Sequence, residues 1–355
     1  MTLLYAECKL CGPRPGVSTD ALFKCSRCQS VLYCGREHQS EHFATHKTTC
    51  RHIKKLRERM VAEEAKVLNA RPDEMTPANA FETHVGMFYG ILNTRPYIHA
   101  KFELIRTLST QDTHTAIEAA LTEGLDCLRL CRVDNLGVRE IVPVLMLMLG
   151  KYQECYDFIK WWATCDPQGQ YDWGDMSLPY LNIRDADITE ELTPFQRDDN
   201  VFLLAALTYV KMNQAKAVLD VIQANLFSDA VSLPGLVGSS IQSFLSPMRD
   251  ANERDFEQLQ KLYLKLQYQA VEAFTMTHYR NQHFWKAMLN PAPLIVQPKP
   301  QYYTPGEPLQ VKLWVQQNAM LWRDHQAFIR DNLTVFPDKL PEEPRRGPVR
   351  LITYP

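Results

Sequence analysis

The sequence predicts a mainly α-helical protein in which a small N-terminal module, rich in cysteine and histidine, precedes an irregular array of antiparallel helical hairpins. Three observations support this fold class. Six of the ten cysteines lie within the first fifty residues. From residue 78 to residue 333, amphipathic helical segments alternate with turn residues. With 45% hydrophobic and 23% charged residues, the 355-residue chain has the composition of a globular protein with a sizeable core.

The first residues, MTLLYAECKL, lack the charged segment and apolar stretch of a signal peptide. The longest apolar run, residues 141–149, is too short to span a bilayer. We therefore expect an intracellular protein, cytoplasmic, nuclear or both, that is neither secreted nor bound to a membrane. In a reducing compartment, clustered cysteines indicate metal binding rather than disulfides. Four later cysteines lie in apolar helical segments and are expected to be buried thiols: Cys127, Cys131, Cys155 and Cys165.

The N-terminal module, expected to span residues 1–52, offers nine candidate metal ligands. They are Cys8, Cys11, Cys25, Cys28, Cys34, His38, His42, His46 and Cys50. Two tetrahedral zinc ions need eight ligands, and mixed thiolate and imidazole donors in sets of four suit zinc best. We expect no open coordination position, so the two zinc ions have a structural role. They stabilise a module that is too small to fold through its apolar core alone.

The spacing of the ligands predicts how they pair. Two pairs have the Cys-x2-Cys spacing of zinc knuckles and two have the i,i+4 spacing of one helical face: Cys8–Cys11 and Cys25–Cys28, and Cys34–His38 and His46–Cys50. Because a helix rises about 1.5 Å per residue, positions 38 and 50 would lie roughly 18 Å apart and cannot share an ion. The consistent solution is cross-braced, with Cys8, Cys11, Cys34 and His38 on zinc 1, and Cys25, Cys28, His46 and Cys50 on zinc 2. His42 is left over, and it would be the substitute ligand if His38 did not bind.

Residues 8 to 50 resemble a MYND-type zinc finger. The usual pattern of that family ends Tyr-Cys-x3-Cys-Gln-x3-Trp-x2-His-x3-Cys, and this chain reads Tyr33-Cys34-x3-His38-Gln39-x3-Phe43-x2-His46-x3-Cys50. The chain departs from the pattern at His38, where the family has cysteine, and at Phe43, where it has tryptophan. Imidazole can replace thiolate as a zinc ligand, so we expect the first departure to preserve the site.

MYND domains are protein-interaction modules, and several bind proline-rich peptides of the Pro-x-Leu-x-Pro kind beside the Gln-x3-Trp face. The resemblance therefore implies a protein partner, such as a proline-rich peptide, at Gln39 and Phe43. These residues lie one helical turn apart, and they offer an amide to a peptide backbone and an aromatic face to proline rings. The alternative interpretation is that Phe43 belongs to the small core of the module.

Residues 53–77 are expected to form a basic helix and a linker. Residues 1–60 carry eleven Lys or Arg against five Asp or Glu. A basic module raises the hypothesis of a nucleic-acid-associated regulator. The basic residues cluster on one short helix, however, and no aromatic residues alternate with them. We therefore interpret the run as a solvent-exposed helix face and do not expect nucleic-acid binding.

The helical-hairpin domain is expected to span residues 78–333. Two antiparallel pairs are predicted: residues 113–135 with 138–165, joined by DNLG, and residues 199–212 with 214–227 across Asn213. The stretch LLAALTYVKMNQAKAVLDVI resembles tetratricopeptide-type hairpins, but the period is irregular. An irregular array of hairpins is therefore favoured over a regular solenoid, and a plain helical bundle is the alternative.

Residues 166–194 form a loop with seven acidic residues against one basic residue, and their spacing is not that of a calcium loop. We expect a long surface excursion, held on the helices by Tyr171, Trp173, Tyr180 and Leu181. Residues 290–308 contain six prolines and are expected to form an extended strap, packed on the helices, before one last helix over 309–333. The tail, residues 334–355, is expected to be mobile or loosely docked.

No catalytic motif is found. The Asn-His-Ser/Cys-x-x-Pro-Asn cofactor motif of the SET-and-MYND lysine methyltransferases is absent, and neither GxGxxG nor GxxxxGK[ST] occurs. We therefore predict that the protein is not an enzyme. Two alternatives stay open, namely an unrecognised enzyme activity and a ubiquitin ligase that uses the cross-braced finger.

The whole layout combines the finger, the segment Cys155-Tyr-Asp-Phe-Ile-Lys-Trp-Trp162 and a proline-containing segment before the last helix. This layout is similar to that of MYND-finger proteins of fungi and related microbial eukaryotes. The sequence therefore predicts a zinc-binding adaptor for protein–protein interactions. In this interpretation zinc organises a module that recognises one partner, and the helical region presents a second surface.

Overall fold

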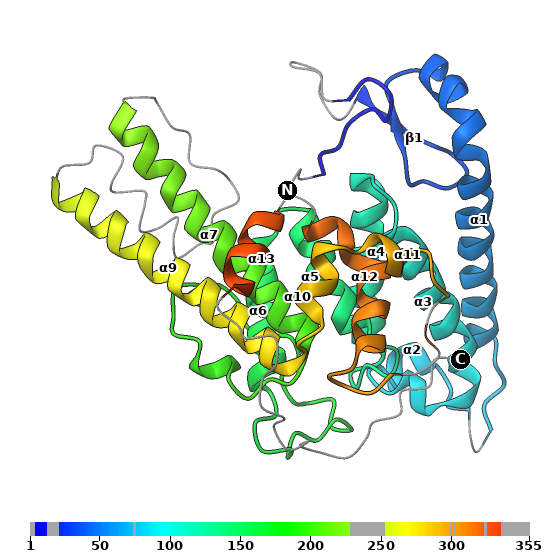
Figure 1. The fold of residues 1–355 in the computed structure, drawn as a ribbon. Helices are drawn as coiled ribbons and strands as arrows, with labels where there is room; N and C mark the ends of the chain where they lie inside the picture. Colours follow the sequence, from blue (N-terminus) through cyan, green and yellow to red (C-terminus); the bar gives the residue numbers. More distant parts are fainter. Residues whose placement is uncertain are drawn as a thin grey trace. The chain divides into compact units, whose positions relative to one another are not determined.

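The computed structural model is mainly α-helical, which confirms the predicted fold class (Figure 1). It describes residues 4–12, 21–73, 76–227, 253–298, 300, 303–322 and 325–334. Its helices are α1 (Arg36–Leu68), α2 (Ala80–Thr83), α3 (Arg95–Ser109), α4 (His114–Leu130), α5 (Val138–Met148), α6 (Tyr152–Thr164), α7 (Val201–Phe227), α9 (Glu253–Arg280), α10 (Phe284–Leu289), α11 (Ala292–Ile295), α12 (Pro308–Trp322) and α13 (Gln326–Leu333). Short 3₁₀ turns η2, η3 and η4 lie at Phe88–Gly90, Leu92–Thr94 and Thr193–Phe195. None of the helices in the described ranges has the length and apolar content that crossing a bilayer requires.

The chain forms two compact units. The first comprises residues 2–149 with 172–180, and the second comprises residue 1 together with 150–171 and 181–355. The finger and helices α1 to α5 belong to the first unit, and α6 to α13 belong to the second. The domain boundaries predicted from the sequence, at residues 52, 77 and 333, stay a prediction.

Helix α1 extends well beyond the finger. Strands β1 (Phe23–Lys24) and β2 (Leu32–Tyr33) form an antiparallel pair just before it. No glycine or proline interrupts residues 36–68, so the helix that carries the last metal-ligand candidates continues through the basic segment. In that segment Ile53 and Leu56 are buried, and α1 packs against α3. The finger is therefore anchored to the rest of the first unit by a shared helix.

Helices α3, α4 and α5 form the apolar core of the first unit. Lys101 of α3 is buried, and it forms ion pairs with Glu123 and Asp126 of α4, the latter at 2.9 Å. On the other side of α4, a Cβ atom at Gly124 would lie only 3.2 Å from the Val142 side chain. The absence of a side chain at Gly124 thus allows α4 and α5 to approach closely.

The second predicted hairpin is wrong, because residues 201–227 form one continuous helix, α7, rather than two helices joined at Asn213. No glycine or proline lies within α7. The Asn213 side-chain amide donates a hydrogen bond to the Tyr209 carbonyl, 2.9 Å away and four residues earlier. An asparagine that bonds along the helix in this way does not end it. The partner of α7 is the next long helix, α9, and the two lie side by side (Figure 1).

A pair of substitutions tests the continuity of α7. In a helix interior, glycine is about 1 kcal/mol less favourable than alanine, whereas in a turn with a left-handed residue glycine is favoured. We expect Asn213→Gly to lower the free energy of unfolding by about 1 kcal/mol relative to Asn213→Ala. Urea denaturation, followed by circular dichroism, measures the difference. Equal stability of the two variants, or a more stable glycine variant, would contradict a continuous α7 and support the predicted turn at residue 213.

The segment predicted as one helix over residues 138–165 is divided into α5 and α6. The division occurs at Gly150, whose φ of 73° lies in the left-handed region that favours glycine.

The proline-rich strap, residues 290–308, is only partly extended, because α11 lies within it. Pro291 precedes α11 directly, where a missing N–H costs no intrahelical hydrogen bond.

The last predicted helix consists of two helices. Helix α12 ends at Trp322 and α13 begins at Gln326.

The acidic loop has no α-helix over residues 166–192, in keeping with an irregular excursion. Of its expected anchors, Tyr180 donates a hydrogen bond to the Arg132 carbonyl at 3.5 Å, and Tyr171 packs edge-on against Trp161. The predicted tail lies, beyond Thr334, outside the described residues.

Candidate metal centres

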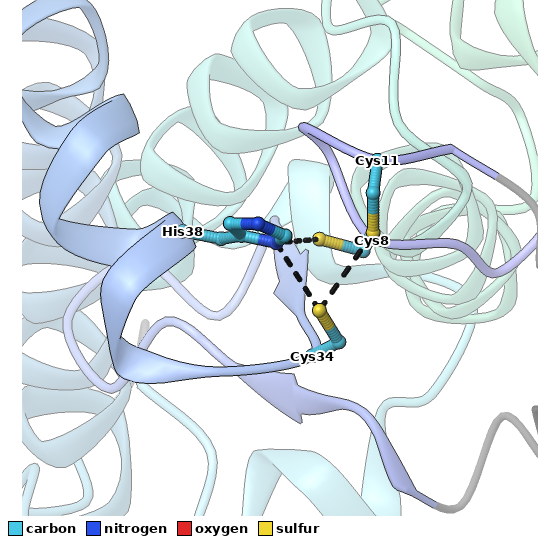
Figure 2. A group of neighbouring side chains, drawn as sticks. All are labelled: Cys8, Cys11, Cys34 and His38. Carbon is cyan, nitrogen blue, oxygen red and sulfur yellow. Dashed lines mark hydrogen bonds between the residues drawn. The ribbon is translucent and has the colours of Figure 1, made fainter.

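The first metal centre brings together the four residues that spacing assigns to zinc 1. In Figure 2, Cys8, Cys11, Cys34 and His38 point toward a common centre. Their ligand atoms all lie within 4.8 Å of one another. The Nδ1 atom of His38 lies 3.4 Å from the Sγ of Cys8 and 3.1 Å from the Sγ of Cys34. The Sγ atoms of Cys11 and Cys34 are 3.7 Å apart.

The second metal centre is more deeply buried than the first. It comprises Cys25, Cys28, His46 and Cys50, all four buried, whose ligand atoms again lie within 4.8 Å of one another. The Sγ atoms of Cys25 and Cys50 are 3.7 Å apart, and the Nε2 atom of His46 lies 3.4 Å from the Sγ of Cys28. These are the four residues that spacing assigns to zinc 2.

The distances within both groups fit a tetrahedral zinc ion. Two sulfur ligands at about 2.3 Å from a tetrahedral ion are roughly 3.8 Å apart, and a sulfur and a nitrogen ligand are roughly 3.5 Å apart. The observed sulfur–sulfur separations of 3.7 Å match the first value and far exceed a disulfide bond. Four donors per group leave no position for a substrate or water, so the chemistry of both centres is structural.

Local backbone structure explains how the thiols converge. In the knuckle at 25–28, Gln29 has a left-handed φ of 58° and its N–H donates to the Cys25 carbonyl at 2.9 Å. This tight turn points both thiols to the same side. In the other knuckle, the N–H of Gly12 donates to the Cys8 carbonyl at 2.9 Å. Helix α1 supplies His38, His46 and Cys50, and the cross-bracing follows because its successive turns face different knuckles.

The local environment shifts the pKa values of the candidate ligands in both directions. Burial alone would raise the pKa of the Cys8 thiol, but the backbone N–H groups of Cys11, Leu10 and Cys34 lower it to about 6. Burial raises the pKa of the Cys28 thiol to about 12, and it lowers the pKa of His46, which keeps that imidazole neutral, as a ligand must be. Burial also raises the pKa of the Cys50 thiol, whereas at Cys25 burial is outweighed by the backbone N–H groups of Cys28 and Arg27, which lower the pKa of that thiol. Zinc binding at the second centre therefore has to displace protons from Cys28 and Cys50.

His42, the surplus histidine, belongs to neither group. Its Nδ1 atom lies 2.8 Å from the hydroxyl oxygen of Tyr33, and its ring stacks on the ring of His46 with the centroids 5.2 Å apart. His42 thus supports the orientation of a candidate ligand rather than facing either centre itself. The alternative in which His42 replaces His38 has no support in this geometry.

Further residues that the sequence analysis did not single out support the second centre. The carbonyl of Cys28 accepts hydrogen bonds from the Arg57 Nε at 3.0 Å and from the Ser30 hydroxyl at 2.9 Å. The Thr113 hydroxyl donates to the Ser30 carbonyl at 2.6 Å. Arg57 lies 29 positions from Cys28 in a run of basic residues, and no local pattern distinguishes it from its neighbours. Only the packing of α1 over the knuckle reveals this role.

Gln39 and Phe43 lie on the first turns of α1, between the residues of the two centres. Phe43 is 42% exposed, so it is not part of a buried core of the finger. Gln39 is half-buried, and its side-chain amide forms no hydrogen bond with the residues that the structure describes. The two side chains therefore offer an accessible aromatic ring and an amide on one side of the helix.

Two interleaved centres, each with four cysteine or histidine donors, define the class of cross-braced zinc-binding modules. Within this class, residues 8–50 match the family model of the MYND finger. The finger and its two zinc ions, which the sequence predicts, are confirmed by this match together with the two groups of ligands. No curated protein and no solved structure matches the chain. The MYND finger is a zinc-binding protein-interaction domain, and the match covers only this part of the chain.

Proposed function

We propose that the protein is a non-enzymatic, intracellular adaptor whose MYND finger binds a proline-rich peptide of a partner protein at Gln39 and Phe43. The observation that carries this proposal is the exposure of Phe43 beside two zinc centres that fix the helix bearing it. In this role the zinc ions are structural: they stabilise the surface that binds the peptide and take part in no reaction. The eight residues of the two groups are the zinc ligands in this proposal.

The chemistry of the two side chains supports a proline-rich ligand. An extended, proline-rich peptide presents rings that pack on an aromatic face, and its backbone carbonyls need donors. Phe43 offers the aromatic face, and the Gln39 amide, one turn earlier, offers the donor. A phenyl ring presents less surface than the indole found in most MYND fingers. We therefore expect the site to bind a proline-rich peptide with moderate affinity.

The helical region provides the second surface of the proposed adaptor. Helix α9 carries a row of exposed apolar residues on one face: Leu264, Tyr268, Val271 and Tyr279. Scattered exposed apolar residues are ordinary, but a row of them along one helix is typical of protein contact surfaces. The proposal assigns no catalytic residue. Zinc-dependent transfer of ubiquitin by the purified protein, in the presence of a panel of conjugating enzymes, would overturn its non-enzymatic part.

Substitutions at the proposed peptide site test the function. We expect Phe43→Ala to weaken binding of a fluorescein-labelled Pro-x-Leu-x-Pro peptide roughly 10-fold, since truncating a central aromatic contact commonly has this effect. We expect Gln39→Ala to weaken it less, because one hydrogen bond is lost. Fluorescence anisotropy of the zinc-loaded, full-length protein measures both effects. The full chain is needed because α1 buries Ile53 and Leu56 outside the finger.

A matched control shows whether the loss of peptide binding is specific to the Phe43 site or follows from removing any exposed aromatic side chain. Tyr268→Ala removes another exposed aromatic residue, 69% exposed, from α9 in the second unit, and it should leave peptide binding unchanged. Each variant must also retain two zinc ions per chain. If Gln39→Ala and Phe43→Ala bind the peptide as tightly as the unmodified chain does, or if the unmodified chain does not bind it, the proposed peptide site is wrong.

A further inference from the structure

The row of α1 residues that starts at Gln39 and Phe43 continues as a basic surface. Lys47, Arg51 and Lys55 follow at intervals of four residues, and all three are exposed. Residues four apart lie next to one another on the surface of a helix. We call Lys47, Arg51 and Lys55 the basic ridge. The ridge therefore begins one turn after the proposed peptide site and extends away from it along the same helix.

No acidic residue in the described part of the chain neutralises the basic ridge. Neither Lys47, Arg51 nor Lys55 forms an ion pair there. The neighbouring Lys54 differs, since it pairs with Glu58 at 3.4 Å. The opposite side of α1 buries Ile53 and packs against α3, so the ridge faces solvent and has no role in that packing. A row of three unpaired cations is a surface suited to an anionic partner.

The spacing of the ridge matches an extended peptide. Four residues of α-helix rise about 6 Å, so the three cations follow one another at that interval. In an extended chain, side chains on the same side are two residues apart, which corresponds to roughly 6.6 Å. A peptide that continues from the Phe43 site along α1 would therefore bring every second side chain next to a cation.

We propose that the partner peptide carries acidic residues at alternate positions on one side of its proline-rich segment, and that the basic ridge binds them. This inference rests on the proposed function, because it assumes that the proline-rich segment occupies Gln39 and Phe43. It adds the chemistry of the partner, which has a proline-rich part for the aromatic face and an acidic part for Lys47, Arg51 and Lys55.

A short acidic peptide fits the ridge better than a nucleic acid does. The chain has a net charge of −2, and residues 1–60 carry eleven basic against five acidic residues, so the rest of the chain is acidic. Further along α1, past Arg59, the basic run gives way to Glu63 and Glu64, which would repel a polyanion longer than the ridge, whereas a short peptide places only a few charges beside the ridge. The ridge itself contains no aromatic side chain on which bases could stack.

Binding of three peptides to the zinc-loaded, full-length protein tests the inference. The first contains Pro-x-Leu-x-Pro flanked by Gly and Ser, and the other two carry an added Glu-Ser-Glu-Ser-Glu, one before and one after the motif. Only one of the two acidic segments can lie along the ridge when the motif occupies the Phe43 site. We expect the peptide with that segment to bind about 10-fold more tightly than the neutral peptide at low salt, because it forms three exposed charge pairs of modest strength. This advantage should shrink as the salt concentration rises.

Variants assign the effect to the ridge. Combined substitution of Lys47, Arg51 and Lys55 by alanine should remove the advantage of the acidic peptide and leave binding of the neutral peptide unchanged. A matched triple substitution at the exposed lysines of the second unit, Lys151, Lys216 and Lys261, should preserve the advantage. Phe43→Ala should weaken binding of all three peptides.

Three results would overturn the inference in distinguishable ways. If all three peptides bind equally, the ridge does not contact the partner, and the proposed function still stands. If none of them binds, the proposed function is wrong and the inference falls with it. If a single-stranded oligonucleotide of equal charge displaces the acidic peptide at lower concentration than an unlabelled acidic peptide does, the ridge is a nucleic-acid surface instead.

Discussion

Replacing Cys28 by serine should remove zinc from the second centre and unfold the finger. Cys28 is completely buried, and its Sγ atom lies 3.4 Å from the Nε2 atom of His46. Binding of a structural zinc ion contributes about 10–16 kcal/mol in small metal-dependent modules, far more than the apolar core of some fifty residues supplies. We expect the zinc content to fall from two ions per chain to at most one, as measured by native mass spectrometry.

Hydrogen exchange shows where the unfolding stops. Amides between residues 21 and 50 should exchange at least 100-fold faster in Cys28→Ser, while amides of α7 in the second unit keep their protection. Cys165→Ser serves as the matched control, because Cys165 lies outside both centres and its Sγ donates to the Trp162 carbonyl. That variant should keep two zinc ions. A Cys28→Ser protein that also keeps two ions would show that the second zinc ion does not depend on Cys28.

The metal centres could be predicted because the information they need is local in the sequence. A Cys-x2-Cys pair forms a knuckle within one turn, and an i,i+4 pair faces one side of a helix wherever that helix lies. The rise per residue of a helix then excludes the sharing of one ion by His38 and Cys50. The residues that support the centres could not be predicted in this way. Arg57 and Thr113 reach the second knuckle only because α1 and the α3–α4 connection pack beside it.

The helical fold class could also be predicted, but several helix boundaries could not. Asn213 is typical of turns, yet its side chain bonds to the carbonyl four residues earlier and α7 continues through it. Gly150, by contrast, ends a helical run that reads as continuous, because it takes a left-handed conformation. Asparagine and glycine are both compatible with a helix and with a turn. Tertiary packing decides between the two, and it cannot be read from a local pattern.

Lys211 illustrates a residue whose role depends wholly on packing. In the sequence it reads as an ordinary polar position of a helical segment, but its side chain is completely buried on α7. Its Nζ atom donates to the Ile188 carbonyl at 2.6 Å and to the Gln269 side-chain oxygen at 2.8 Å, and it lies over the Tyr156 ring. Gln269 in turn donates to the Glu190 carbonyl at 2.8 Å. This cluster fixes the end of the acidic loop onto α7 and α9.

Replacing Lys211 by methionine should destabilise the second unit by about 3 kcal/mol. The methionine fills most of the space but donates no hydrogen bond, so the Ile188 carbonyl and the Gln269 oxygen are left buried without their donor. Urea denaturation measures the loss. Lys216→Met, one helical turn further along α7, replaces an exposed lysine that pairs with Asp220, and it should change stability by less than about 0.5 kcal/mol. Equal stability of the two variants would contradict the structural role of Lys211.

The dependence of this loss on pH reports the protonation of the Lys211 amino group. Burial lowers the pKa of Lys211 to about 7, and the carboxylates of Glu190 and Asp187 only partly oppose this effect. In the unfolded chain the pKa of a lysine is about 10.4, so between pH 7 and pH 10 the unfolded state binds a proton that the folded state lacks. The free energy of unfolding of the unmodified chain should therefore rise with pH in this range, by at most about 1.4 kcal/mol per unit from this group. Lys211→Met lacks this contribution, so the difference in free energy of unfolding between this variant and the unmodified chain should grow from pH 7 to pH 9. A difference that stays constant over this range would mean that Lys211 keeps its proton in the folded protein.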